Sequence, residues 1–262
     1  MPARWLVRHD GRMRASLAAV RCGKGDVEGN LATHLRLLTE AASAGCDIAL
    51  FPEMSLTGSV DPASRRDRLA GLDHPAIATL AAASGETGAG VCFGIAERAS
   101  SDRPHITQLF AASGRVLGVQ RKRHLGEGEE AFTAATDSSV LNCAGVRFGI
   151  AICAEAGFDD PFDAAAAAGA PLVLFPAAPG LYGRRTDAVS WQEGHAWWEG
   201  CALDDARRHA KRLGLWIALA GQAGSTEDED FPGLAALVAP DGSVTARLPD
   251  WREGTLIVDI PL

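Results

Sequence analysis

Several features that would point to other classes of protein are missing from this chain of 262 residues. No run approaches the roughly 20 apolar residues of a membrane span, and the N-terminal segment contains no uninterrupted apolar core of signal-peptide length. The six cysteines form no CxxC pair, and no two histidines have the spacing of a zinc site. We therefore expect a reduced, cytoplasmic protein that enters no membrane and needs no metal or organic cofactor.

Basic residues are outnumbered by acidic ones, at 25 Lys and Arg against 33 Asp and Glu. The formal net charge is −8, and RKRH at 121–124 is the only tight basic cluster. That cluster is too short to form an electrostatic footprint, so we expect no nucleic-acid partner. No low-complexity linker divides the chain, and its length, with 47% hydrophobic residues, suffices to bury one large core. We expect a single domain over residues 1–262.

Short apolar runs alternate with helical patterns along the chain. Runs typical of strands buried on at least one face are found at 15–20, 47–51, 91–96, 147–153, 171–175, 215–221 and 255–260. Apolar residues spaced at i, i+3 and i+4 predict a helix over 30–45, and 74–88 and 191–214 are further helix candidates. The segments ASGRV (112–116) and PDGSV (240–244) predict hairpin turns. This alternation, together with the hairpins, indicates an α/β protein with mixed sheet.

One stretch of the sequence is repeated 124 positions later. Residues 41–52 read AASAGCDIALFP, and residues 165–176 read AAAAGAPLVLFP. Each is an Ala-rich helix end, a Gly stop, a short strand and then Phe-Pro. We infer two related halves, although any helix–Gly–strand unit could look similar. After Phe-Pro the copies diverge, because the first continues with Glu53 and the second with Ala177.

Three separate strings each place one reactive side chain after an apolar run. They are IALFPEMSLTG (48–58) with Glu53, VQRKRHL (119–125) with Lys122, and FGIAICAEAGF (148–158) with Cys153. Singly, each has a simpler interpretation: a solvated turn glutamate, a basic surface turn and a small buried cysteine. Together, a carboxylate, an ammonium and a thiol are the groups needed to attack an acyl carbon.

The position of Cys153 favours a nucleophile over a core residue. A strand that ends before small residues exposes the sulfur on a sharp turn and offers the N–H of Ala154 to an oxyanion, as in the logic of a nucleophile elbow. Such a thiol needs nearby positive charge to ionise. We do not expect His124 to be the base, and no GxSxG motif offers an alternative nucleophile.

In order, FPE-x-x-LTG, RKRHL and G-I-x-I-C-x-E resemble the nitrilase (carbon–nitrogen hydrolase) superfamily over most of the chain. The resemblance implies an α/β fold, an α-β-β-α four-layer sandwich with two central mixed sheets, usually dimerised. It also implies that Glu53 is the general base, Lys122 the oxyanion stabiliser and Cys153 the nucleophile.

The resemblance further implies a second glutamate that positions the substrate. GEGEEAF (126–132) supplies Glu127, Glu129 and Glu130, and Glu130 fits best by its distance from the FTAA that follows. The chain departs from the family pattern at Ala134-Ala135, where Pro-Gly is usual, and at Arg212-Leu213, where Glu-Asn is usual. These departures leave the subfamily and the dimer contacts open.

We expect a hydrolase that cleaves a small linear amide through an acyl-thioester. A nitrilase or an N-carbamoyl amide hydrolase with the same triad is the nearest alternative, and a non-catalytic binding or scaffold relative is a more distant one. The expected partners are a small amide or nitrile substrate and further copies of the chain, in a homodimer or a higher homo-oligomer. Trp191, Trp197 and Trp198 are interpreted as core or dimer interface in preference to a pocket wall.

Overall fold

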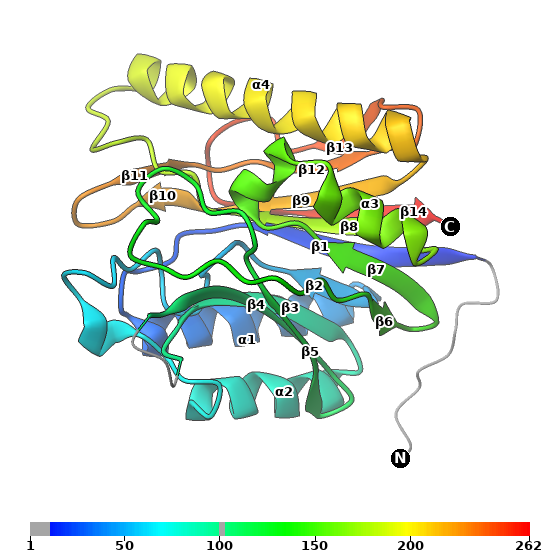
Figure 1. Ribbon diagram of the computed structural model, residues 1–262, viewed down its shortest axis with the longest axis horizontal. Helices are drawn as coiled ribbons and strands as arrows, with labels where there is room; N and C mark the ends of the chain where they lie inside the picture. The colour runs from blue at the N-terminus through cyan, green and yellow to red at the C-terminus, as the bar shows by residue number, and fades with distance from the viewer. Residues whose placement is uncertain (1–10, 100–102) are drawn as a thin grey trace.

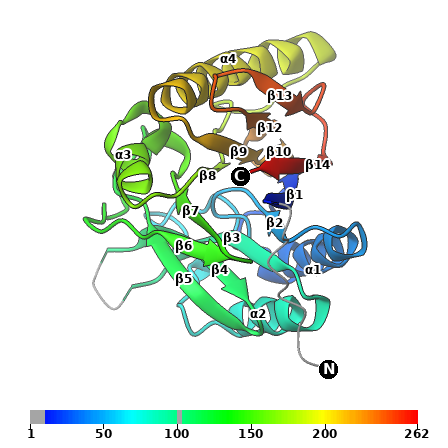
Figure 2. The same ribbon diagram turned by 90° about the vertical axis from the view of Figure 1, so that its right-hand side faces the viewer.

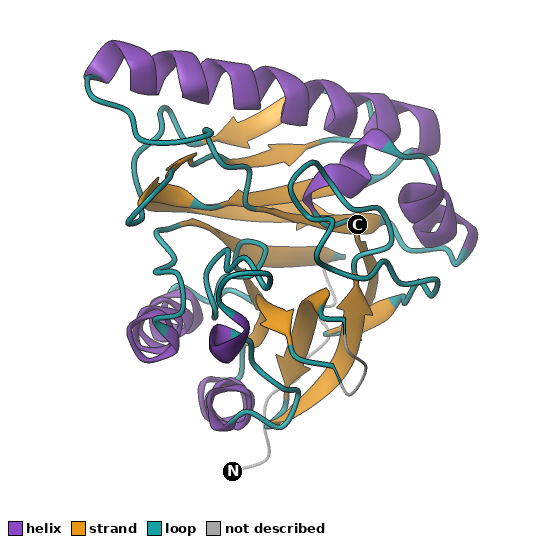
Figure 3. Ribbon diagram, turned by 60° about the vertical axis from the view of Figure 1, so that its left-hand side comes forward, coloured by secondary structure: helices purple, strands orange, loops and turns teal. Residues whose placement is uncertain are grey.

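The computed structural model describes residues 11–99 and 103–262. Two six-stranded mixed sheets lie face to face, and helices cover the outer face of each (Figure 1). Figure 2 shows these layers from the side, and Figure 3 shows the helices outside the two layers of strands. The fold is the α-β-β-α sandwich that the resemblance to the nitrilase superfamily implies.

The first sheet has the strand order β14-β1-β2-β3-β4-β5. Its strands are β14 (Gly254–Pro261), β1 (Arg12–Ala19), β2 (Ile48–Leu50), β3 (Gly90–Glu97), β4 (His105–Ala112) and β5 (Arg115–Arg121). The helices α1 (Val27–Ser43) and α2 (Pro75–Thr87) pack on its outer face. Asp26 begins α1 by accepting a hydrogen bond from the N–H of Gly29, three residues earlier than the apolar pattern predicts.

The second sheet has the order β13-β12-β9-β8-β7-β6. Its strands are β13 (Val244–Arg247), β12 (Ala235–Val238), β9 (Trp216–Gly221), β8 (Leu172–Ala177), β7 (Val146–Ile150) and β6 (Leu141–Cys143). The helices α3 (Asp160–Ala167) and α4 (Ala188–Leu213) cover it. A short pair, β10 (Ala223–Ser225) with β11 (Asp230–Pro232), and two 3-10 turns, Arg66–Arg68 and Cys153–Gly157, complete the described elements.

The repeated sequence forms the same unit in both sheets. β2 lies between two parallel neighbours, β1 and β3, and β8 lies between two parallel neighbours, β7 and β9. Ile48 and Leu50 face the core between the sheets, as Leu172 and Leu174 do. The alternate positions, such as Phe51, pack under the outer helices. The two halves therefore present equivalent strand ends to the same region of the molecule.

The predicted strands and both predicted hairpins are present, with one informative difference. The apolar run predicts a strand over 147–153, but β7 ends at Ile150. Cys153 instead begins a 3-10 turn with φ of +47°, which is incompatible with a continuing strand. The difference places the cysteine on a bend.

Candidate active site

A cavity of about 480 Å³ opens where the chain leaves β2, β7 and β8. Cys153, Ala154 and Glu129 lie in its wall, and the rings of Phe132, Phe175 and Trp198 supply apolar surface. Glu53 and Lys122 lie behind this wall and are almost fully buried. The three reactive side chains therefore come together from three distant parts of the sequence.

Glu53 follows β2 and is 1% exposed. Its Oε1 accepts a hydrogen bond from Lys122 Nζ at 2.7 Å, and its Oε2 accepts one from the N–H of Ala178 at 3.1 Å. Ala178 directly follows β8, the counterpart of β2 in the second half. We call the segments that follow the two Phe-Pro pairs, at 51–52 and 175–176, the Phe-Pro exits. The two exits thus meet at the carboxylate of Glu53.

The loop that carries Glu53 is held by buried polar groups from α1. Asn30 donates a hydrogen bond to the carbonyl of Leu56 at 3.0 Å, and His34 Nε2 pairs with Ser55 Oγ at 2.9 Å. Ser55 Oγ also accepts the N–H of Gly94 at 3.1 Å. A Cβ on Gly94 would lie 2.3 Å from the backbone nitrogen of the residue after Glu53, so only glycine lets β3 approach this loop.

Lys122 follows β5 and is completely buried. Its ammonium donates to Glu53 Oε1 at 2.7 Å and to Glu129 Oε1 at 2.6 Å, so one cation bridges two carboxylates. Glu129 is itself oriented by the N–H of Gly126, which donates to its Oε2 at 2.6 Å.

The three candidate glutamates differ in what their side chains contact. Glu130 is exposed, and its carboxylate accepts a hydrogen bond from the N–H of Gly128. Glu127 is also exposed, although it lines the cavity. Glu129 is the one that reaches Lys122, because the turn at 126–129 folds its side chain inward. Spacing to a later motif could not reveal this turn.

Cys153 begins the 3-10 turn that follows β7, and its positive φ directs the side chain into the cavity. A non-glycine residue in this backbone region is strained and persists where the surrounding structure enforces it. The thiol is the cavity-lining group on which the charges of Glu53, Lys122 and Glu129 all act. Ala154 follows it in the cavity wall.

The charges of the site are strongly coupled. Burial raises the pKa of Glu53, and the charge of Glu129 adds to this effect while Lys122 opposes it. Burial alone would lower the pKa of Lys122, but Glu53, Cys153 and Glu129 outweigh it and raise that pKa. Burial, Glu53 and Glu129 raise the pKa of the Cys153 thiol, against the influence of Lys122. The resting site therefore holds a neutral thiol beside an ammonium that two carboxylates share.

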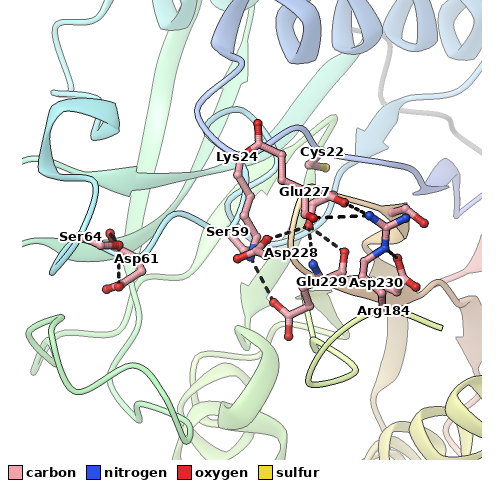
Figure 4. Close-up of polar contacts among 12 residues, drawn as sticks. Cys22, Lys24, Ser59, Asp61, Ser64, Arg184, Glu227, Asp228, Glu229 and Asp230 are labelled. Carbon is pink, nitrogen blue, oxygen red and sulfur yellow. Dashed lines mark hydrogen bonds and ion pairs between the residues drawn. The ribbon is translucent and has the colours of Figure 1, made fainter.

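The outer part of the cavity is ringed by carboxylates. Asp61, Glu127, Asp205 and Glu229 lie in its lining, and Lys24 is the one lysine there. Figure 4 shows that Lys24 lies against residues of the β10–β11 turn, and its Nζ is 2.8 Å from Asp228 and 3.3 Å from Glu229. Because the charge of Lys24 is paired with Asp228 and Glu229, Lys24 does not neutralise the other carboxylates of the lining, and this part of the cavity stays acidic.

Two of the three tryptophans expected in the core or interface line the cavity. Trp198 is 8% exposed and packs in the core between α4 and the second sheet, yet it also reaches the cavity. Trp197 is 47% exposed and lines the cavity too. Trp191 is partly buried and is not part of the lining.

Within residues 11–99 and 103–262, no cluster of three or more His, Cys, Asp or Glu side chains could hold a metal ion. No helix in the same residues is both long enough and apolar enough to cross a bilayer.

Two contacts made around Glu53 and Lys122 lie outside what the motifs predict. The spacing of the motif favours Glu130 over Glu129, and no motif indicates the N–H of Ala178. The internal repeat could have indicated Ala178, because it aligns the exit of β8 with the exit that carries Glu53.

Comparison with known proteins gives a consistent result. The chain is 25% identical to a glutamine-dependent NAD(+) synthetase of Rhodobacter capsulatus over 95% of this chain, but it spans only 44% of that protein. It is 25% identical to an N-carbamoylputrescine amidase of Arabidopsis thaliana, covering 90% of this chain and 83% of that one. Relatedness at this level supports a hydrolase acting on carbon–nitrogen bonds other than peptide bonds.

A solved structure of an amidase from Nesterenkonia sp. superposes with a TM-score of 0.81 at 26% identity, covering 98% of this chain and 93% of that one. In a variant of the same amidase, with a TM-score of 0.81 at 25% identity and the same coverage, the acetamide moiety of fluoroacetamide is added covalently at the active site cysteine. The sequence profile of the carbon–nitrogen hydrolases matches residues 15–262. The chain belongs to the carbon–nitrogen hydrolase family, within the nitrilase superfamily.

Proposed function

We propose that this hydrolase cleaves a small linear amide through an acyl-thioester on Cys153. The observation that carries the proposal is the buried bridge of Lys122 between Glu53 and Glu129, directly behind a strained cysteine in the cavity wall. A carboxylate whose pKa is raised by burial is suited to exchanging protons with a thiol and a leaving amine.

In the first half of the reaction, Cys153 sulfur bonds to the carbonyl carbon while its proton passes to Glu53. Two ammonium protons of Lys122 are bonded to Glu53 and Glu129, and the third, together with the N–H of Ala154, is assigned to the oxyanion. When the tetrahedral intermediate collapses, the carbon–nitrogen bond breaks and Glu53 returns the proton to the leaving nitrogen. Ammonia or an amine departs, and the acyl group remains on sulfur.

In the second half, a water molecule attacks the thioester while Glu53 accepts its proton. The carbon–sulfur bond then breaks, the proton returns to sulfur, and the carboxylic acid leaves. Glu129 orients Lys122 throughout, and we assign the place of the family's second glutamate to it in preference to Glu130.

The test is a panel of matched amides and nitriles of two to five carbons, with released ammonia as the readout. We expect turnover of the amides by the wild-type chain and none by Cys153→Ala. Preferential turnover of the nitriles, which would proceed through a thioimidate, would favour the nitrilase alternative and contradict the proposal.

The acidic outer cavity favours a second candidate, an N-carbamoyl amide whose far end carries an ammonium group. Of the four carboxylates in the lining, Glu229 is paired with Lys24 and Asp205 with Arg208. Asp61 and Glu127 therefore supply the negative charge that attracts a cation and repels an anion. N-carbamoylputrescine amidases are among the relatives of similar length. In a matched series of amides that end in an ammonium, hydroxyl or carboxylate group, the cationic member should have the lowest KM, and added salt should reduce its advantage.

We also propose a two-fold homodimer, the commonest closed oligomer. Sedimentation at micromolar concentration tests this: one species near the chain mass of 27.4 kDa would rule out the dimer.

A further inference from the structure

The last residue of the motif FGIAICAE, Glu155, has no part in the reaction as proposed above. It is completely buried, and it does not line the cavity. Its Oε1 accepts a hydrogen bond from the N–H of Arg123, and its Oε2 accepts one from the N–H of Ile152, each at 2.7 Å. Arg123 directly follows Lys122, and Ile152 directly precedes Cys153.

We propose that Glu155 is a positioning residue that holds the backbone of Lys122 and the backbone of Cys153 at a fixed separation. The inference rests on the proposed function, in which these two side chains act on the same carbonyl group. Glu155 touches neither the substrate nor the reacting atoms, so its effect passes through the two peptides that it joins.

The need for such a link follows from the topology. Lys122 follows β5, an edge strand of the first sheet, whereas Cys153 follows β7 in the second sheet. Because β5 and β7 lie in different sheets, strand pairing does not fix the position of Lys122 relative to Cys153. A misplacement of about 1 Å between reacting groups can cost on the order of 100-fold in rate. One carboxylate bonded to both loops removes this freedom.

Only a carboxylate can accept a hydrogen bond from the N–H of Arg123 and from the N–H of Ile152 through two separate oxygens. Each of its oxygens accepts from one N–H, and hydrogen bonds to an ionised acceptor are shorter and stronger than neutral ones. Glutamine has nearly the same shape, but its amide NH₂ would face one of the two N–H donors. Burial raises the pKa of Glu155, while the two N–H groups and the charge of Arg123 oppose that rise. The two N–H groups and the charge of Arg123 thus favour the ionised form of Glu155.

The experiment compares Glu155→Gln with Asp47→Asn, a matched variant remote from the site. The Asp47 carboxylate also accepts a backbone N–H, that of Arg14 at 2.7 Å, but at the end of β2 opposite Glu53. We expect Glu155→Gln to lower kcat by roughly 10- to 100-fold with KM changed less than about threefold. Asp47→Asn should leave both within about twofold, since it contacts neither loop.

A second measurement does not depend on the substrate. Iodoacetamide labelling, followed site by site with mass spectrometry, gives the rate at Cys153 relative to exposed Cys201 in the same molecule. This ratio should fall about tenfold in Glu155→Gln, because the thiol loses its alignment with Lys122, and should stay constant in Asp47→Asn. If the wild type hydrolyses no amide, the proposed function fails. The ratio of labelling at Cys153 to labelling at Cys201 still tests whether Glu155 positions Cys153.

A purely structural role gives a different pattern. It would lower the melting temperature of Glu155→Gln while kcat per folded molecule and the labelling ratio matched the wild type, and that result would overturn the proposal. Should Glu155→Gln not fold, Glu155→Asp keeps the charge but retracts the carboxylate by one methylene. The shorter aspartate side chain can reach only one of the two N–H groups, so the labelling ratio of Cys153 to Cys201 should fall in Glu155→Asp as well.

Discussion

The two Phe-Pro exits occupy equivalent places in the two sheets and contribute different groups. The exit of β2 supplies the carboxylate of Glu53, whereas the exit of β8 supplies the N–H of Ala178, which donates to that carboxylate. Position 177, the counterpart of Glu53, is a fully buried alanine at the end of β8. In the proposed reaction, one copy of the unit provides the base and the other donates a hydrogen bond to it.

The two exits also differ in what holds them. The loop after β2 is tied to α1 through Asn30 and to β3 through Ser55. The loop after β8 continues along the cavity at Pro179, Gly180 and Tyr182 before α4 begins. The β8 loop is also held, because the N–H of Leu181 donates to the carbonyl of Asp230 in β11 at 2.9 Å and the N–H of Arg185 donates to the Asp230 carboxylate. The first loop therefore fixes the position of a carboxylate, whereas the second fixes a wall of the cavity. The comparison teaches that one duplicated unit can serve both needs.

The largest expected effect comes from the thiol itself. Cys153→Ala removes the nucleophile, so turnover should fall by about 10⁴-fold or more. Cys201→Ala, at an exposed thiol that also lies in the cavity lining, should retain most of the activity. Initial rates of ammonia release measure both. Similar losses in the two variants would mean that the cysteines act through the shape of the cavity rather than through sulfur chemistry.

The counterpart positions of the two copies should differ nearly as much. Glu53→Gln removes the base and should lower kcat by about 10³-fold. Ala177→Gly occupies the matching place in β8, where it should cost about 1 kcal/mol of stability and leave kcat of the folded enzyme within about threefold. Steady-state kinetics with a thermal melt separate the two effects. Comparable losses of kcat would show that both exits, not one, carry the reaction.

The sequence indicated the fold and the reactive side chains but not the contacts between loops. Continuous apolar runs located β2 and β8 because both strands are buried on two faces, and the repeat revealed their equivalence. The motifs marked Glu53, Lys122 and Cys153. The inward turn of Glu129 and the donation by Ala178 depend on how distant loops pack, and no local pattern encodes that. The positive φ at Cys153 ended β7 before the apolar run ended.

The pH dependence should report the carboxylates around Lys122. Glu53 must be ionised to accept the thiol proton, and burial raises its pKa, so kcat/KM should fall on the acid side at a higher pH than an ordinary glutamate would give. Glu129→Gln removes a negative charge that contributes to this rise. The acid limb should then move to lower pH, whatever the loss in kcat. A shift to higher pH would contradict the assignment of that limb to Glu53.

The smallest effect concerns two buried histidines, one in the outer helix layer of each half. His34 of α1 stacks on Phe51, and His209 of α4 stacks on Phe162. Burial lowers the pKa of His34 to about 4, against the opposing hydrogen bond to the carbonyl of Asn30. Burial also lowers the pKa of His209, with Arg208 and Arg212 acting in the same direction and Ala156 and Asp159 opposing them.

Both histidines should therefore destabilise the fold in acid. The unfolded chain binds a proton near pH 6.5, whereas folded His34 does so only near pH 4, so stability is complete above about 6.5 and is lost as the pH falls between these values. For His34 the loss is roughly 3 kcal/mol. His34→Gln should remove more of the acid-dependent drop in melting temperature than His209→Gln, because His34 has the deeper shift and supports the Glu53 loop. Equal pH dependence in both variants and the wild type would show that neither histidine is held neutral.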